Sequence, residues 1–204
     1  VLYITYTNRA KEEAQKQITE TSSSLLKIET VHTFVHQFLK NYLKEEKVVE
    51  MIREKFEFEP NEQGFYRYNY KRDSRKGEIG HDDLIKVFTY LISHKNLPGL
   101  QEHLLRLFDY VYIDEFQDLD LNFIWQMINL YDSNGFGSKL YIFGDTTQQI
   151  YDPINHYQEE QKRYVTDYQL LKDILAYEKK DVPLYNYRSS QTVIYLISEA
   201  HTSE

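Results

Sequence analysis

The chain has 204 residues, of which 41% are hydrophobic, with a formal net charge of −8 and no cysteine. This length supports one substantial α/β core with a small insertion, and the lack of cysteine excludes disulfides, thiolate metal sites and cysteine nucleophiles. No apolar run reaches the roughly 18 residues of a membrane helix, so we expect a soluble, cytoplasmic protein with no membrane contact. The negative charge argues against a surface that coats DNA, so any nucleic-acid contact must be local.

The first part of the chain predicts short strands that alternate with helices. Residues 2–7 form a short apolar and β-branched run, and residues 10–18 have a helical pattern. A second strand is predicted at 25–29 and a helix at 33–43, where apolar residues recur at helical spacing. Residues 41–62 are acidic and helix-like, which is typical of a solvated helix face.

Residues 65–76 differ sharply from the acidic stretch before them, because aromatic rings alternate there with five basic side chains. Rings that stack on bases and cations that follow phosphates would make this stretch a contact for single-stranded nucleic acid. An exposed hairpin strand with alternating faces accounts for the same pattern. The residues alone favour neither interpretation.

Helices and strands continue to alternate through the rest of the chain. We predict helices at 82–94, 100–108 and 123–131, and strands at 110–113, 140–143 and 182–185. Such alternation indicates an α/β fold, with a mainly parallel sheet covered by helices on both faces.

Two of the predicted strands end in polar clusters, which matters because parallel sheets bind ligands beyond the carboxyl ends of their strands. One strand runs directly into Asp114 and Glu115. In nucleotide-hydrolysing folds, an Asp at such a strand end can hold Mg²⁺ and a Glu can orient the attacking water. The other strand runs into residues 144–151, where Gln148 could meet a phosphate oxygen or a water. A capped turn that enters a helix is the alternative interpretation of this second cluster.

The last predicted strand is followed by residues 186–190, which read Asn-Tyr-Arg-Ser-Ser. The guanidinium of Arg188 suits the charge that develops on a transferred phosphoryl group, because it forks onto the oxygens. The ring of Tyr187 could stack on a base. A Tyr-Arg pair has little meaning by itself, so its interpretation depends on the other motifs.

Six short blocks occur in order from one end of the chain to the other. They are ITYTNRA at 4–10, TVHTF at 30–34, HDDLI at 81–85, DEFQD at 114–118, GDTTQQIY at 144–151 and NYRSS at 186–190. In order and spacing they resemble motif Ia, motif Ib, an F-D-D-L-I segment with His for Phe, and motifs II, III and IV of one family. That family is the superfamily 1 helicases of the UvrD/Rep/PcrA group.

The resemblance implies a RecA-like fold and a division of the chain. Residues 1–40 and 81–204 would form part of a RecA-like ATPase domain, similar to the family's 1A domain and ending near its junction with the 2A domain. Residues 41–80 would be an insertion, a reduced form of the family's 1B subdomain. The parent protein would couple ATP hydrolysis to 3′-to-5′ movement along single-stranded DNA and to unwinding.

The resemblance also implies roles in ATP hydrolysis. Asp114 would bind Mg²⁺, and Glu115 would act as the base that activates water. Gln148 would sense the γ-phosphate of ATP and couple it to DNA contacts. Arg188 would contact the same phosphate, and Tyr187 would stack on the adenine.

The resemblance implies single-stranded DNA, or junctions between duplex and single strands, as the partner, and three further residues lie where the family contacts single-stranded DNA. They are Tyr6, His32 and Tyr151, and stacking of a base on such rings is worth roughly 1–3 kcal/mol each. His32 and His36 are four residues apart without an accompanying carboxylate, so we expect no metal site there. Neither the motifs nor the composition specifies whether a nuclease or DNA-repair partner accompanies the chain.

The chain departs from the family in its phosphate-binding loop. No G-x-x-x-x-G-K-S/T sequence occurs in it, and the nearest imitation, at 135–139, lacks the spacing and precedes a strand. In the family this loop lies upstream of motif Ia, so we expect a fragment of one motor domain that is inactive alone. A non-catalytic nucleic-acid-binding or regulatory module is the alternative. The four intact residues Asp114, Glu115, Gln148 and Arg188 favour the motor.

Overall fold

The computed structural model describes residues 1–18, 26–132, 135–144 and 194–198. The chain divides into two compact units, which are called here the sheet unit (Val1–Glu29 with Gln101–Glu204) and the helical unit (Thr30–Leu100). The predicted insertion at 41–80 falls inside the helical unit, which extends beyond it at both ends. Among the described residues, no helix is both long and apolar enough to cross a membrane.

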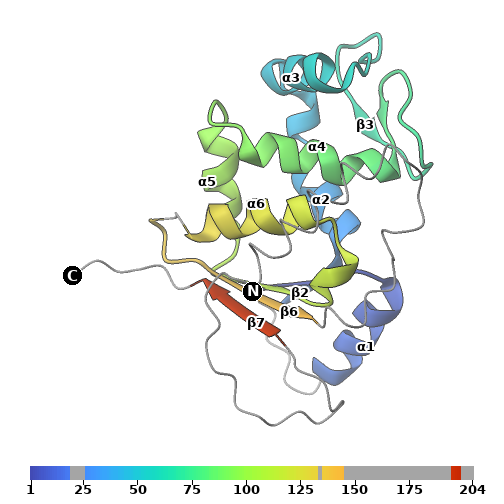
Figure 1. Cartoon of the computed structure of the whole chain (residues 1–204). Helices are drawn as coiled ribbons and strands as arrows, with labels where there is room; N and C mark the ends of the chain where they lie inside the picture. The colour runs from blue at the N-terminus through green and yellow to red at the C-terminus, as the bar shows by residue number, and fades with distance from the viewer. Residues whose placement is uncertain (19–25, 133–134, 145–193, 199–204) are drawn as a thin grey trace, which may run out of the picture. The chain divides into compact units, whose positions relative to one another are not determined.

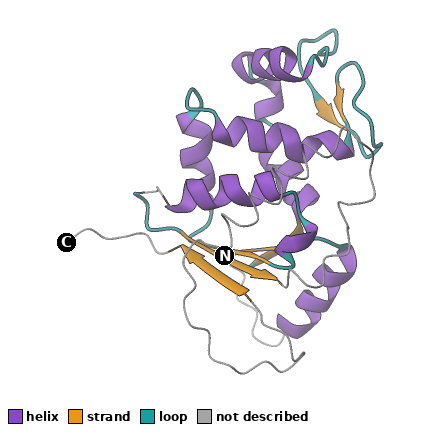
Figure 2. Ribbon diagram, in the orientation of Figure 1, coloured by secondary structure: helices purple, strands orange, loops and turns teal. Residues whose placement is uncertain are grey.

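The main sheet confirms the predicted fold class, an α/β fold of RecA-like type with a mainly parallel sheet (Figures 1 and 2). Its strands are β1 (Leu2–Thr5), β2 (Lys27–Thr30), β5 (Tyr110–Ile113), β6 (Lys139–Gly144) and β7 (Ile194–Ser198), in the spatial order β2-β1-β5-β6-β7. The pairs β1–β5 and β5–β6 are parallel, whereas β7 runs antiparallel to β6. Two strands distant in sequence, β1 and β5, therefore lie side by side with their carboxyl ends together.

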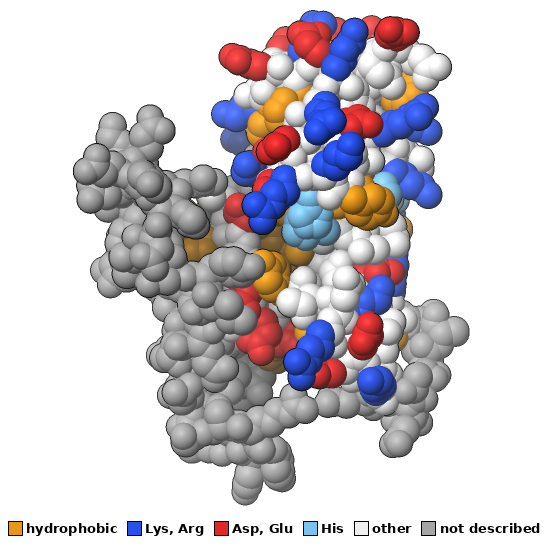
Figure 3. All heavy atoms as spheres, turned by 90° about the vertical axis from the view of Figure 1, so that its right-hand side faces the viewer, with side chains coloured by type: hydrophobic (Ala, Val, Ile, Leu, Met, Phe, Trp, Pro, Cys, Tyr) orange, Lys and Arg blue, Asp and Glu red, His pale blue; other side chains and the backbone are white. Residues whose placement is uncertain are grey.

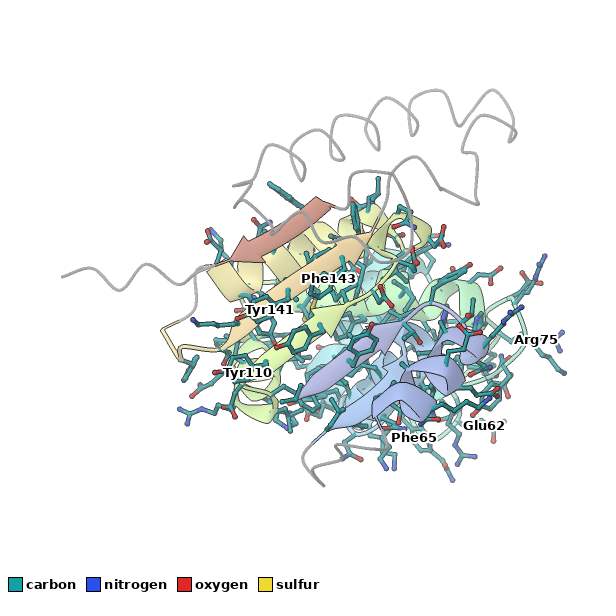
Figure 4. All side chains as sticks on the ribbon, turned by 90° about the horizontal axis from the view of Figure 1, so that it is seen from below. Glu62, Phe65, Arg75, Tyr110, Tyr141 and Phe143 are labelled. Atoms are coloured by element: carbon teal, nitrogen blue, oxygen red, sulfur yellow. The ribbon has the colours of Figure 1, made fainter. Side chains whose placement is uncertain are left out.

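Strands β1, β5 and β6 alternate between aliphatic residues on one face of the sheet and aromatic residues on the other. On β1 and β5, the aliphatic side chains of Ile4 and Ile113 are fully buried. The intervening positions carry tyrosines that are partly exposed, and the rings of Tyr112 and Tyr141 stack with centroids 4.9 Å apart. Figure 4 labels three aromatic residues of this kind on β5 and β6, namely Tyr110, Tyr141 and Phe143. The alternation is that of strands in a sheet, whose side chains point to opposite faces in turn.

The sheet unit also contains helices α1 (Asn8–Ile18) and α6 (Leu121–Asp132), the short 3₁₀ helix η2 (Phe116–Asp118) and, from Gln101 on, helix α5 (Pro98–Leu107). Helix α6 buries one face, because its buried residues recur at helical spacing. These residues are Phe123, Ile124, Met127, Ile128 and Tyr131. The carboxylate of Asp120 accepts the backbone N–H groups of Asn122 and Phe123, at 2.8 and 3.1 Å, and so caps the start of the helix.

The helical unit consists of α2 (Val31–Leu39), η1 (Tyr42–Lys44), α3 (Glu46–Phe56), β3 (Arg67–Tyr68), β4 (Glu78–Ile79) and α4 (His81–Ser93). Its core is aromatic: Phe34 and Phe38 of α2 both meet Phe88 of α4 edge to face, with centroids 6.0 and 5.8 Å apart. Thr30 caps α2 by accepting the backbone N–H of Thr33. The stretch at 65–76 supplies β3, which pairs with β4 in parallel, and it also supplies Arg75, which forms an isolated antiparallel bridge with Glu78.

The strand predicted at 182–185 lies outside the described residues. The strand β7, at Ile194–Ser198, was not predicted, although it completes one edge of the described sheet. The other predicted strands lie within a few residues of β1, β2, β5 and β6.

Candidate functional site

The candidate site lies where β1 and β5 end side by side. The register pairs Ile4 with Ile113, and the backbone N–H of Asp114 continues the pairing by donating to the carbonyl of Ile4 at 2.9 Å. A pocket of about 240 Å³ opens at this edge. Its lining includes Thr5, the last residue of β1, with Tyr6 and Thr7 after it, and Asp114, Glu115 and Gln117 after β5. Two blocks more than 100 residues apart in sequence thus form one pocket.

The carboxylate of Asp114 is oriented by hydrogen bonds. The hydroxyl of Tyr3 donates to its Oδ2 at 2.8 Å, and the backbone N–H of Glu115 donates to its Oδ1 at 3.1 Å. Each carboxylate oxygen keeps a further lone pair, so both remain able to accept another partner. The strand end therefore presents a partly exposed anion whose direction is fixed.

Glu115 has an unusual backbone, with φ of 52° in the left-handed region. For a residue other than glycine this conformation costs about 1–2 kcal/mol. Its side chain is exposed, and the amide of Gln117 donates to its Oε2 at 2.5 Å. Backbone strain at a residue held by a specific partner is typical of functional sites.

Gly144, the last residue of β6, packs directly on the turn after β5. A Cβ atom at this position would lie 2.2 Å from Oε1 of Gln117 and 2.6 Å from the ring of Phe116. Only glycine fits without displacing one of them. The same Gln117 side chain thus holds Glu115 through its amide nitrogen and contacts the end of β6 through its oxygen.

Of the other predicted site residues, two lie within the described parts of the chain and four do not. Tyr6 lies in the pocket, half-buried. His32 lies in the helical unit, where its ring stacks on His81 with centroids 3.7 Å apart and planes 10° apart. Four predicted site residues lie outside the described residues: Gln148, Tyr151, Tyr187 and Arg188.

Burial, and secondarily the neighbouring His81, lowers the pKa of His32 from 6.5 to about 4. His32 is therefore neutral at pH 7, and the stack brings no two positive charges together. His81 lies at the position of the Phe in the F-D-D-L-I segment that residues 81–85 resemble, so the exchange preserves a ring in this place.

Sequence reasoning missed Tyr3 and Gln117. Tyr3 lies between the buried Leu2 and Ile4, so its side chain must point to the opposite face of the sheet, and that alternation was a usable signal. Gln117 lies inside the DEFQD block but received no role, because its contact with Gly144 links segments far apart in sequence.

Asp114 fits one ligand of a magnesium ion. Mg²⁺ prefers oxygen ligands and is commonly held by one or two carboxylates together with waters and substrate phosphates, not by an all-protein cage. Within the described ranges, no group of three or more His, Asp or Glu side chains suited to a metal occurs. When bound with a nucleotide, the ion would neutralise charge on the phosphates.

A mainly parallel α/β sheet with carboxylates beyond a strand end is an arrangement that occurs in nucleotide-binding enzymes. The comparison with protein families agrees: a family model described as an AAA domain matches residues 1–153. The chain belongs to this family, a helicase-like P-loop domain that is found in UvrD/Rep-type proteins. AAA-type domains generally bind ATP with Mg²⁺ and hydrolyse nucleotides. No curated protein matches the chain.

Proposed function

We propose that the chain serves an ATP-dependent motor of the UvrD/Rep/PcrA type, which moves 3′ to 5′ along single-stranded DNA and unwinds duplex at junctions. Asp114 would hold Mg²⁺ and Glu115 would activate the attacking water. The absence of cysteine suits work in a reducing cytoplasm. Because the 204 residues contain no phosphate-binding loop, hydrolysis needs such a loop from elsewhere.

The observation that carries the proposal is the pair of adjacent carboxylates at the pocket. One carboxylate is oriented by Tyr3 and stays open to a cation, whereas the other is exposed and held by Gln117. A metal ligand beside a general base is what phosphoryl transfer to water requires. Gln117 also contacts Gly144, which starts the block assigned by resemblance to γ-phosphate sensing, and so offers a direct link between the two blocks.

The test is ATP hydrolysis by the longest natural polypeptide that contains this chain, measured with and without single-stranded DNA. In the Glu115→Gln variant we expect hydrolysis to fall at least about 100-fold, since a general base contributes 10² to 10⁴ in rate, while ATP binding persists. Glu12→Gln is the matched control, because it removes an exposed carboxylate of the same unit away from the pocket, and it should hydrolyse ATP normally.

Each of these measurements could contradict the proposal. Normal turnover by Glu115→Gln would exclude Glu115 as the base. No turnover by the unchanged polypeptide would favour the alternative function, a nucleic-acid-binding or regulatory module with a helicase-like fold. For the 204-residue chain by itself we expect no ATP hydrolysis, and activity stimulated by DNA would contradict the need for a further loop.

A further inference from the structure

The helical unit has a second pocket, of about 530 Å³, formed where the end of α2 and η1 meet β3. Its lining includes three cationic side chains, an imidazole and a phenol that matter for the argument: Lys40, Lys44, Arg67, His36 and Tyr68. None of these residues falls within the six blocks that resemble the helicase family. Figure 3 shows basic side chains around a histidine on the face of the molecule that carries β3.

The pocket is basic and its cations are available. No Asp or Glu occurs among the described residues that line it. Lys40, Lys44 and Arg67 are all exposed, and within the described parts of the chain none of them forms an ion pair. The guanidinium of Arg67 lies over the ring of Phe65, 5.1 Å from its centroid, which holds the cation at the surface.

The distribution of charge along the chain singles out the same unit. The helical unit has twelve of the 24 Lys and Arg residues and eleven of the 32 Asp and Glu residues, so its net charge is +1. The remaining twelve basic and 21 acidic residues give the sheet unit −9. A polyanion approaching this acidic protein therefore meets least repulsion at the helical unit.

Two rings that line this pocket, those of His36 and Tyr68, belong to a connected aromatic series that continues to Tyr70, outside the lining. The ring of His36 lies 4.7 Å from that of Tyr68, and the ring of Tyr70 lies 4.9 Å from it on an edge-to-face contact. The hydroxyl of Tyr68 hydrogen-bonds Nδ1 of His81 at 2.6 Å, and His81 stacks on His32. The series thus reaches from the pocket to the residue that resemblance assigns to DNA contact.

These contacts fix the rings before any ligand binds. Tyr68 is held at its hydroxyl by His81 and at its ring by two neighbours, so little rotamer entropy is left to lose. Burial, and then the charge of Lys40, lowers the pKa of His36, which keeps its ring neutral at pH 7. Tyr70 is 83% exposed, so one face of an aromatic ring stands open to a base.

We propose that this pocket is a binding site for single-stranded nucleic acid, with bases stacked on the rings of His36, Tyr68 and Tyr70. Phosphates on either side of the stacked bases contact Lys40, Lys44 and Arg67. Aromatic platforms beside a cationic groove are the usual means of binding single strands without regard to sequence. The site deepens the proposed function, since it adds a contact for the strand along which the motor would move.

The test is fluorescence anisotropy of a labelled oligo-dT of about 12 nucleotides, a length within the usual site size, titrated with the full chain at several salt concentrations. The double variant Lys40→Ala/Lys44→Ala should weaken binding about tenfold at low salt. It should also reduce the slope of log K against log salt by about 1.4, since each phosphate contact on a single strand contributes about 0.7. The control Lys55→Ala/Lys95→Ala removes the same charge from exposed positions of the same unit outside the pocket.

The stacking part of the site has its own pair of variants. Tyr70→Ala removes an exposed ring and should weaken binding at least about fivefold, because a stacked base is worth 1–3 kcal/mol. Phe136→Ala removes an exposed ring of the sheet unit and should leave binding unchanged. Circular dichroism of each variant checks that the fold is intact.

The outcomes separate this site from the motor. Binding needs no ATP, so weakened binding in the pocket variants supports the site even if the polypeptide never hydrolyses ATP. Equal losses in pocket and control variants, or no binding of oligo-dT or oligo-rU by the chain, would overturn it. If the unchanged chain bound oligo-rU but not oligo-dT, the site would be assigned to RNA, and its link with a DNA motor would be overturned.

Discussion

The two units of the chain hold their candidate functional groups in different ways. In the sheet unit, the end of β5 places two carboxylates at a pocket, and a left-handed backbone at Glu115 accompanies them. In the helical unit, rings and cations from three separate elements meet, and stacking with hydrogen bonding orients them. The comparison teaches that a strand end can position reactive groups through the backbone, whereas a surface contact depends on side-chain packing.

The largest expected effect is a loss of stability when the close contact between Gly144 and the turn after β5 is disrupted in the sheet unit. Gly144→Ala forces a Cβ against the buried ring of Phe116, and overpacking of this kind costs about 2–3 kcal/mol. Urea unfolding followed by circular dichroism measures the loss. Gly99→Ala in α5 is the control, because no atom lies within 4 Å of its Cβ position, and it should leave the stability nearly unchanged. Equal stability of the two variants would refute the close packing of β6 on the turn.

The second-largest effect concerns the helical unit, and it is a dependence of the free energy of unfolding on pH. Because the pKa of His32 falls to about 4 on folding, the unfolded chain binds a proton between pH 6.5 and 4 that the folded chain does not. The free energy of unfolding should therefore decrease as the pH is lowered through that window, by roughly 1–2 kcal/mol after allowance for the solvent that reaches the ring. Urea unfolding at several pH values measures this.

His32→Gln is the variant that checks the assignment to one side chain. It removes the titrating ring, so its stability should depend less on pH between 6.5 and 4 than that of the unchanged chain. An identical pH dependence in both proteins would show that another group titrates.

A third effect concerns the orientation of Asp114. Tyr3→Phe keeps the ring and removes the hydroxyl that donates to Oδ2. If Asp114 binds the metal as proposed, the Mg²⁺ concentration for half-maximal ATP hydrolysis by the longest natural polypeptide should rise about tenfold, as is typical when a partner of a metal ligand is lost. Tyr112→Phe, in the next strand, is the control. An unchanged Mg²⁺ requirement in Tyr3→Phe would remove Tyr3 as a positioning residue.

The smallest effect is expected for a hydrogen bond in the helical unit. The buried Tyr66 donates its hydroxyl to the carbonyl of Phe58, and burial raises the pKa of Tyr66 to about 12. Tyr66→Phe should lower the free energy of unfolding by about 1 kcal/mol, the typical net worth of one such bond. Tyr70→Phe removes an exposed hydroxyl and should change nothing measurable. If both variants match the unchanged chain, the Tyr66 bond contributes nothing to stability.

Much of the fold was predictable because its signals are local. The alternation around Ile4 and Ile113 identifies strands, and the helical spacing of Phe34 and Phe38 identifies α2. The missed strand, Ile194–Ser198, is a short apolar run, and periodicity alone does not separate such a run from a buried helix segment.

The candidate site was predictable only in part, for a physical reason. Asp114 and Glu115 follow an apolar run directly, so their place at a strand end is readable. The stack of His32 on His81 and the contact of Gln117 with Gly144 join positions distant in sequence, and no local pattern encodes them. The left-handed backbone of Glu115 was also unreadable, since glycine is the residue that usually marks such a conformation.

That backbone has a consequence for protein engineering. Glu115 and Glu57, which ends α3, are the non-glycine residues with positive φ among those described, and glycine at either position would relieve about 1 kcal/mol of strain. A laboratory selection for heat resistance alone would therefore accept glycine at both. At residue 57 we assign no functional role to the glutamate, so the added stability would cost no activity that we propose. At residue 115 the protein would become more stable but would lose the carboxylate on which we expect ATP hydrolysis to depend.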